Sequence, residues 1–243
     1  MMVDDVCLAQ SRGRRRRFAV LFANVSSWSA QARSFFAAES PDVALAVETN
    51  LAGVQYGAEC RRLKAAKYYV TGAAARPNPF SVPGRRAGDS GADPGRSTTG
   101  GLLLIAQPYL EVAGLHLVDN GKDLLQLSGP RHTFALWRLS GISFLVGAVY
   151  LRPGAESEQD SLMALAEAAA VVRKTGLPFV LAGDFNRRPE AFMRLGWAQR
   201  LRARVVAPSV DTATTRCPTS LIDYFIVSDR IKHLIDSVNV LNI

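Results

Sequence analysis

The chain has 243 residues, of which 48% are hydrophobic, and this is enough for one domain with a large core. Its hydrophobic runs are shorter than the roughly 18 residues of a membrane-spanning helix, which excludes a helical membrane protein. The formal net charge of +8 favours a polyanionic partner, although charge alone does not distinguish a nucleic acid from an anionic lipid surface.

The cysteines and histidines exclude two common kinds of site. Three cysteines at wide spacing make neither a disulfide framework nor a Cys-x-x-Cys metal clamp. The three histidines, His116, His132 and His233, are equally scattered, so a zinc hydrolase would lack its ligands. A metal in this protein would be held by oxygen atoms, which is the preference of Mg²⁺ and Mn²⁺.

Residues 1–17 contain the run "RGRRRR" and are predicted to be a basic, disordered tail. The following residues 18–25 do not form the apolar core of a signal peptide, because their pattern is typical of a strand and no small-residue cleavage pattern follows. The sequence therefore indicates an intracellular protein, with the nucleus included among the expected locations.

The remaining chain, residues 18–243, is predicted to be one domain in which strands alternate with helices. Helices are expected over residues 29–39 and around residues 162–172, the second ending near Gly176. Residues 75–99 are rich in Gly, Pro and Arg, and we expect a disordered loop there. The predicted strands cover residues 18–25, 42–49, 101–107, 132–139, 142–151, 178–185 and 221–228.

Polar residues recur at the ends of these apolar strands. Each one alone has a simple explanation as a turn residue, a solvated strand end or a sheet aromatic. Their recurrence instead predicts that they meet at one rim of the fold, where sites are commonly built. Asp223 stands out, because an ionised carboxylate within an apolar strand requires a partner. The residues are Asn24, Glu48, Tyr150, Asp184, Asn186 and Asp223.

Six segments in order, from about residue 18 to about residue 228, resemble motifs of the endonuclease/exonuclease/phosphatase superfamily. They are "FANVSSW", "PDVALAVETNL", "TTGGLLLIA", "VGAVYLRPG", "LAGDFN" and "SLIDYFIVS". This superfamily includes apurinic-site nucleases, endonucleases of non-LTR retrotransposons, inositol polyphosphate 5-phosphatases and neutral sphingomyelinases. The resemblance implies a deoxyribonuclease-I-like fold, a four-layer α/β sandwich of two mixed sheets flanked by helices.

The resemblance also implies metal-dependent hydrolysis of a phosphate ester. Glu48, assisted by Asn24, would hold Mg²⁺ or Mn²⁺. Asp184 would orient or deprotonate the attacking water, and Asn186 and Tyr150 would donate hydrogen bonds to the phosphate.

The end of the chain departs from the family pattern, in which Asp223 would orient a histidine of a final Ser-Asp-His motif. The sequence has Ser228 and Asp229 followed by Arg230, and His233 falls too close to Asp223. The chain therefore resembles a truncated or degenerate member. Weak activity is expected, together with loss of the last strand or closing loop.

The basic balance favours a nucleic acid, DNA above all, over a small inositol phosphate. Arg187 and Arg188 directly follow "GDFN" and are predicted to bind the substrate. Two alternatives remain open at this point. One is an inositol-phosphate or sphingolipid phosphodiesterase of the same superfamily, and the other is a non-catalytic nucleic-acid-binding relic of a retroelement endonuclease.

Overall fold

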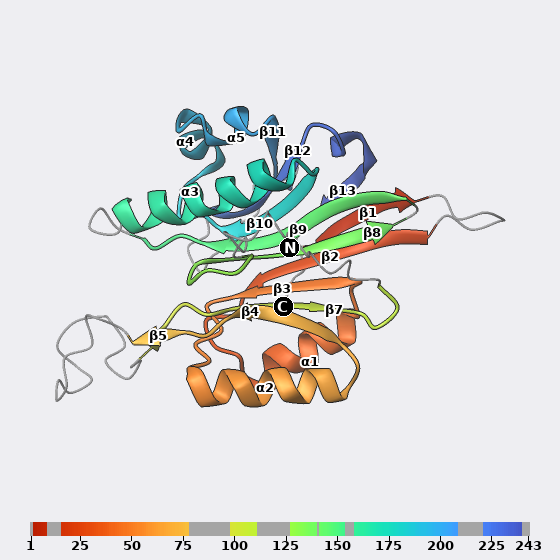
Figure 1. Ribbon diagram of the computed structural model, residues 1–243, viewed down its shortest axis with the longest axis vertical. Helices are drawn as coiled ribbons and strands as arrows, with labels where there is room; N and C mark the ends of the chain where they lie inside the picture. Colours follow the sequence, from red (N-terminus) through yellow and green to blue (C-terminus); the bar gives the residue numbers. More distant parts are fainter. Residues whose placement is uncertain are drawn as a thin grey trace, which may run out of the picture.

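The computed structural model describes residues 2–8, 16–77, 98–110, 127–139, 141–153, 158–208 and 221–239. Within these ranges two mixed β-sheets pack face to face, and helices cover their outer faces (Figure 1). This arrangement confirms the predicted four-layer α/β sandwich. The first sheet is covered by α1 (Ala30–Glu39) and α2 (Gly53–Ala65), and the second by α3 (Glu158–Thr175), α4 (Pro189–Arg194) and α5 (Trp197–Arg200).

The first sheet has the strand order β13-β1-β2-β3-β7-β4. Strands β2 and β3 are parallel, so their carboxyl ends lie at the same edge of the sheet. Helix α1 connects them, and the other strand pairs are antiparallel. The strands are β1 (Met2–Leu8), β2 (Arg16–Asn24), β3 (Val43–Val47), β4 (Tyr69–Ala73), β7 (Leu102–Ala106) and β13 (Ile235–Asn239).

The second sheet has the strand order β11-β12-β10-β9-β8. Strands β9 and β10 are parallel and are joined by α3, whereas β12 runs antiparallel to β10. The carboxyl ends of β9 and β10 and the amino end of β12 therefore share one edge. The strands are β8 (His132–Leu139), β9 (Ile142–Tyr150), β10 (Phe179–Asp184), β11 (Ala203–Val206) and β12 (Asp223–Ser228).

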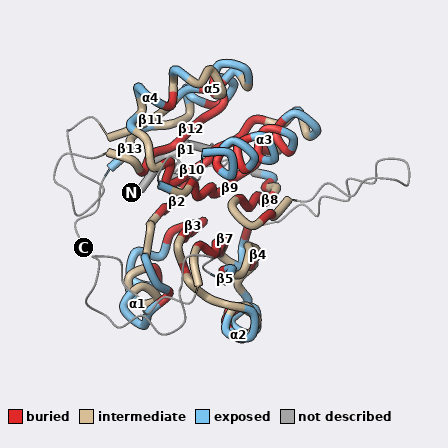
Figure 2. The backbone as a smooth tube through the Cα atoms, turned by 90° about the vertical axis from the view of Figure 1, so that its left-hand side faces the viewer, coloured by how far each residue is buried: buried red, intermediate tan, exposed pale blue. Residues whose placement is uncertain are grey.

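The core follows from the four layers. Every residue of β3 and β10 is buried, because one face of each strand packs against the opposite sheet and the other lies under helices. Between the sheets, Phe22 and Phe225 meet edge to face with ring centroids 6.5 Å apart. Beneath the helices of the first sheet, Leu21 packs in a cluster with Trp28 and Phe36. Figure 2 shows buried residues along the strands and exposed residues on the helices.

Local signals account for the ends of α1. The side chain of Ser29 accepts a hydrogen bond from the backbone N–H of Ala32 at 3.1 Å, which makes Ser29 the N-cap. The helix ends at Ser40, which has a left-handed φ of 45°, and Pro41 follows it. Three short elements complete the fold: β5 (Arg76–Pro77), β6 (Thr98–Thr99) and the 3₁₀ helix η2 (Lys232–Leu234).

The N-terminal residues differ from the predicted disordered tail. Residues 2–8 form β1, which pairs with β2 on one side and β13 on the other, so its backbone groups gain partners on both edges. Residues 16–17 already belong to β2, and residues 9–15 lie outside the described ranges. Strands β1 and β13 continue the first sheet beyond β2.

The predicted disordered loop at residues 75–99 is described only at its two ends. There β5 and β6 pair antiparallel, Arg76 with Thr99 and Pro77 with Thr98. Residues 78–97 lie outside the described ranges. Among the helices in the described ranges, none has the length and apolar character required to cross a membrane.

Candidate active site

Three predicted site residues lie side by side on the second sheet. Asp184 is the last residue of β10, and it is in register with Tyr150, the last residue of β9, and with Asp223, the first residue of β12. All three are buried. Residues in register on neighbouring strands have side chains about 5 Å apart, so this row brings two carboxylates and a phenol together.

Two predicted residues of the first sheet complete the group. Asn24 ends β2, and Glu48 directly follows β3. The Asn24 Nδ2 donates to Asp184 Oδ2 at 2.8 Å, and the Tyr150 hydroxyl donates to Glu48 Oε1 at 2.5 Å. The two sheets are therefore joined at this edge by hydrogen bonds between side chains that the sequence predicts to act together.

The loop after β3 has a backbone conformation that favours a specific placement of Glu48. Glu48 and Asn50 have φ values of 55° and 53°, in the left-handed region, which costs non-glycine residues about 1–3 kcal/mol and is frequent at functional sites. The Asn50 Nδ2 donates to the carbonyl of Ser26 at 2.6 Å and to that of Glu48 at 3.3 Å. Asn50 was not predicted as a site residue, and its only signal is its place two residues after Glu48.

Asp184 is held by two donors. Besides Asn24, the backbone N–H of Asn186 donates to Asp184 Oδ1 at 2.9 Å. Burial raises the pKa of Asp184 to about 6, and the charge of Glu48 adds to this increase, whereas the hydrogen bonds oppose it. Burial also raises the pKa of the Tyr150 phenol, again with a contribution from Glu48, so the phenol is a hydrogen-bond donor at neutral pH.

Asn186 has a left-handed φ of 48° and lies in the turn after β10. Its Nδ2 donates to the carbonyl of Leu151 at 2.5 Å, which ties the turn after β10 to the turn after β9. An amide nitrogen has two hydrogens, so this contact is compatible with a second bond to a substrate oxygen.

The residues present fit a magnesium or manganese ion. Among the described residues, no group of three His, Cys, Asp or Glu side chains is placed to bind a metal. Mg²⁺, however, commonly uses one or two protein carboxylates and keeps several waters. Glu48 and Asp184 supply carboxylates, and Asn24 donates a hydrogen bond to Asp184.

Of the two arginines predicted to bind the substrate, Arg187 forms an ion pair with Glu158 of α3, with Nη2 and Oε1 3.2 Å apart. Arg188 is exposed and is the N-cap residue of α4. The structure therefore places both next to Asn186, on the side of the site formed by α3 and α4.

A third arginine, Arg131, also lies near the site and was not predicted from the sequence. It lies just before β8, and its guanidinium carbon is 5.7 Å from the centroid of the Tyr150 ring, within the range of a cation–π contact. Its backbone carbonyl accepts from the N–H of Tyr150 at 2.9 Å. The only sequence signal was an arginine immediately before a predicted strand.

The described histidines lie away from Asp223. His132 is in register with Val149, so it lies on the face of the sheet opposite to that of Tyr150, and its Nδ1 is 3.3 Å from Glu167 Oε2 of α3. His233 belongs to η2, beyond the end of β12 remote from Asp223. His116 lies outside the described ranges.

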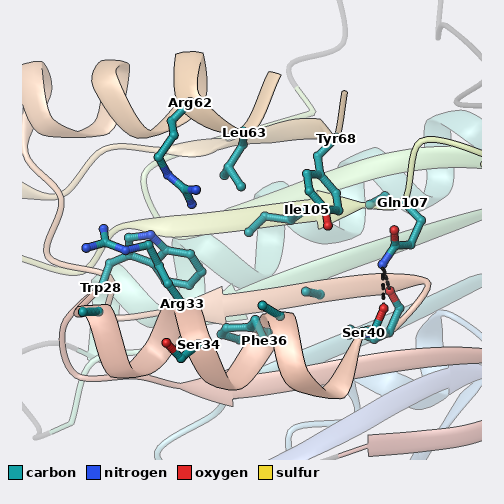
Figure 3. A pocket seen from close by; sticks show the side chains of 15 residues that line it. Trp28, Arg33, Ser34, Phe36, Ser40, Arg62, Leu63, Tyr68, Ile105 and Gln107 are labelled. Carbon is teal, nitrogen blue, oxygen red and sulfur yellow. Dashed lines mark hydrogen bonds between the residues drawn. The ribbon is translucent and has the colours of Figure 1, made fainter. Parts of the chain in front are cut away.

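A separate cavity of about 430 Å³ lies between α1 and α2, on the outer face of the first sheet (Figure 3). Arg33 and Arg62 both reach Glu59, at 3.6 Å and 2.7 Å, so one carboxylate already balances much of their charge. At the other end, Gln107 Nε2 donates to the carbonyl of Pro41 at 3.0 Å. This groove contains none of the predicted site residues.

Comparisons with known proteins are consistent with this fold. A model of the endonuclease/exonuclease/phosphatase family matches residues 21–239. Among solved structures, the endonuclease domain of TRAS1, a telomere-specific non-LTR retrotransposon, has a TM-score of 0.56 and 14% identity, covering 90% of this chain and 94% of that one. A comparison with curated protein sequences found no match.

Two further solved structures have the same fold. The human Nocturnin catalytic domain with bound sulfate anion has a TM-score of 0.55 and 15% identity, covering 86% of this chain and 81% of that one. An AP endonuclease from Archaeoglobus fulgidus has a TM-score of 0.51 and 15% identity, covering 87% and 86%. At such identities the likeness concerns the fold alone.

Proposed function

The chain belongs to the endonuclease/exonuclease/phosphatase family, and we propose that it is a magnesium- or manganese-dependent phosphodiesterase that hydrolyses nucleic acid, with DNA as the favoured substrate. The pair of hydrogen bonds between the sheets, Asn24 to Asp184 and Tyr150 to Glu48, carries this proposal. These bonds gather carboxylates, an amide and a phenol at one edge of the sheets, which supports their action on one phosphate and its attacking water.

Each side chain has a role that its contacts support. Glu48 and Asn24 hold the divalent cation, which when bound neutralises phosphate charge and stabilises the leaving oxygen. Asp184, fixed by Asn24 and Asn186, orients the water and accepts its proton. Asn186 and Tyr150 donate to phosphate oxygens, for which the Tyr150 hydroxyl turns from Glu48 toward the substrate.

The direct test is nicking of supercoiled plasmid with Mg²⁺ and with EDTA. We expect open circles to accumulate only with the metal. Release of phosphate from inositol phosphates without nicking would favour the phosphatase alternative. Binding of DNA without hydrolysis of any phosphate ester would favour the non-catalytic alternative.

We also propose slow turnover, because the two described histidines, His132 and His233, lie away from Asp223. Loss of one preorganised donor to the transition state lowers a rate by about 10²–10³. A version of the protein that carries a Ser-x-His segment beside Asp223 should therefore nick DNA faster. Equal rates for the chain with and without the segment would show that this histidine is not needed.

The protein should bind duplex DNA with little sequence preference and with an affinity that falls steeply as the salt concentration rises. The reason is the net charge of +8, since each phosphate neutralised by Lys or Arg releases condensed counterions. Fluorescence anisotropy at several salt concentrations measures the slope. An affinity for DNA that is independent of salt, or weaker than that for inositol phosphates, would contradict the choice of substrate.

A further inference from the structure

Glu59 lies near the middle of α2 and is a buried carboxylate, with only 6% of the residue exposed. It accepts hydrogen bonds from two side chains, from Trp28 Nε1 at 2.8 Å and from Arg62 Nη2 at 2.7 Å. Arg33 of α1 adds an ion pair at 3.6 Å. Figure 3 shows the side chains of Trp28, Arg33 and Arg62 gathered at one end of the cavity between α1 and α2. Glu59 therefore joins the segment between β2 and α1 to both helices that cover the first sheet.

The carboxylate of Glu59 is ionised at neutral pH. Burial favours a higher pKa, but hydrogen bonds from Arg62 and Trp28, together with the two guanidinium charges, lower the pKa of Glu59 below its usual value. Removing a carboxylate from water is costly, and buried ion pairs often do no more than offset this cost. The ion pairs alone therefore do not account for a glutamate at this position.

Trp28 connects Glu59 to the loop that contains Glu48. Its indole ring is buried against Phe36, with ring centroids 5.4 Å apart, and its indole N–H donates to Glu59. Its backbone N–H donates to the carbonyl of Thr49 at 2.8 Å. One residue thus contacts the carboxylate of α2 through its side chain and the residue after Glu48 through its backbone.

The loop of residues 48–50 is held between two segments of the chain. On one side, the backbone N–H groups of Thr49 and Asn50 donate to the carbonyls of the two glycines that precede β7, at 3.2 Å and 2.9 Å. On the other side, the loop is bound by the backbone of Trp28 and, through the Asn50 side chain, by the carbonyl of Ser26. A left-handed backbone at residues other than glycine persists only where the surrounding structure fixes it. The conformation of this loop therefore depends on contacts from both sides.

We propose that Glu59 is a positioning residue for Glu48. By accepting from the indole of Trp28, Glu59 fixes the backbone N–H that supports the loop, and so holds the carboxylate of Glu48 where the metal binds. The inference rests on the proposed function, in which Glu48 holds the metal, and extends it to a residue outside the candidate active site. Partners that orient a metal ligand typically change metal affinity about 10–100-fold when they are replaced.

Three substitutions separate the bond between Trp28 and Glu59 from the ion pairs. Glu59→Met keeps the length of the side chain but removes the oxygen atoms that accept hydrogen bonds. Glu59→Gln loses the same charge but keeps an oxygen acceptor for the indole. Trp28→Phe removes the donor from the other end and keeps an aromatic ring beside Phe36. Thermal unfolding measures the loss of stability that the two Glu59 variants share through their missing charge.

Amide hydrogen exchange, followed by NMR in EDTA, reports on the loop without metal or substrate. We expect the amides of Thr49 and Asn50 to exchange about 10-fold faster in Glu59→Met and Trp28→Phe, since a hydrogen bond to a charged group is lost. Glu59→Gln should exchange at nearly the wild-type rate. All rates are divided by that of the Leu45 amide in β3, a core strand whose opening follows the stability of the whole protein.

The second measurement is the dissociation constant of Mg²⁺ by isothermal titration calorimetry. Glu59→Met and Trp28→Phe should weaken metal binding about 10-fold, whereas Glu59→Gln should bind Mg²⁺ nearly as tightly as the wild-type protein does. The affinity for duplex DNA in EDTA should stay unchanged in all three variants, because the loop positions a metal ligand and not a group that binds DNA. A general loss of structure would weaken both kinds of binding.

Two sets of results would contradict different claims. If Glu59→Met and Glu59→Gln have equal exchange rates in the loop and equal affinity for Mg²⁺, Glu59 does not position Glu48 through Trp28 and the inference is wrong. If Glu59→Met does not fold, unchanged loop exchange in Trp28→Phe would overturn the inference in the same way. If the wild-type protein binds no Mg²⁺ and nicks no DNA, the proposed function is wrong, while faster loop exchange in Glu59→Met and Trp28→Phe would still show that Glu59 holds the loop.

Discussion

Replacing Asp184 with alanine should lower the rate of phosphodiester hydrolysis by about 10³-fold, within the range of about 10²–10⁴ expected for loss of a general base. Asp184 links the two sheets through Asn24 of β2 and is also held by the backbone N–H of Asn186. The substitution removes the proton acceptor and also releases the Asn24 side chain from its partner. The nicking rate of supercoiled plasmid in Mg²⁺ measures the effect.

Two further variants make this experiment specific. Asp229→Ala removes a half-exposed carboxylate that pairs with Arg204 at 2.8 Å, beyond the opposite end of β12, and it should nick DNA at the wild-type rate. Asp184→Asn keeps the volume of the side chain and one carbonyl acceptor, so it separates loss of the base from loss of packing. If Asp184→Ala retains more than about a tenth of the wild-type nicking rate, Asp184 is not the general base.

The sequence predicted most of the candidate site because of one topological rule. Asn24, Tyr150 and Asp184 end the apolar strands β2, β9 and β10, and Glu48 directly follows β3. These four strands form two parallel pairs. Parallel strands bring their carboxyl ends to one edge, so a polar residue at the end of each strand is enough to predict where the candidate site lies.

Other residues could not be predicted because their roles depend on contacts between distant elements. Arg131 matters through the Tyr150 ring on the neighbouring strand, and Asn50 through the carbonyl of Ser26, 24 residues earlier. Neither contact produces a periodic pattern in the sequence. A single arginine before a strand is most often a solvated residue, and only the structure shows its guanidinium largely buried.

Strand β1, near the edge of the first sheet, is a second feature that the sequence did not predict. Residues 2–8 precede a run of arginines, and charge runs are typical of disordered tails. Strand β1 nevertheless lies between β2 and β13, which is separated from it by more than 200 residues of chain. Whether two strands so far apart in the sequence pair depends on which edge of the sheet the rest of the fold leaves open. Local β-strand propensity does not predict this edge.

The arrangement around Glu48 predicts a large effect on metal binding. Glu48→Gln should weaken binding of Mg²⁺ and Mn²⁺ by at least about 10–100-fold, the loss typical even for residues that only support a metal ligand. The amide keeps the size of the side chain but loses the negative charge that a hard cation requires. Isothermal titration calorimetry of the metal-free protein measures the dissociation constants directly.

Two control variants identify the cause of such a loss. Glu39→Gln changes an exposed glutamate at the end of α1 and should bind Mg²⁺ like the wild-type protein. Tyr150→Phe removes the hydroxyl that donates to Glu48 at 2.5 Å but leaves the carboxylate in place. It should weaken metal binding less than Glu48→Gln does, because Glu48 loses one orienting bond and keeps its charge. Equal affinity for Mg²⁺ in Glu48→Gln and the wild-type protein would show that the metal binds elsewhere, and the roles proposed for Asn24 and Asp184 would then lose their basis.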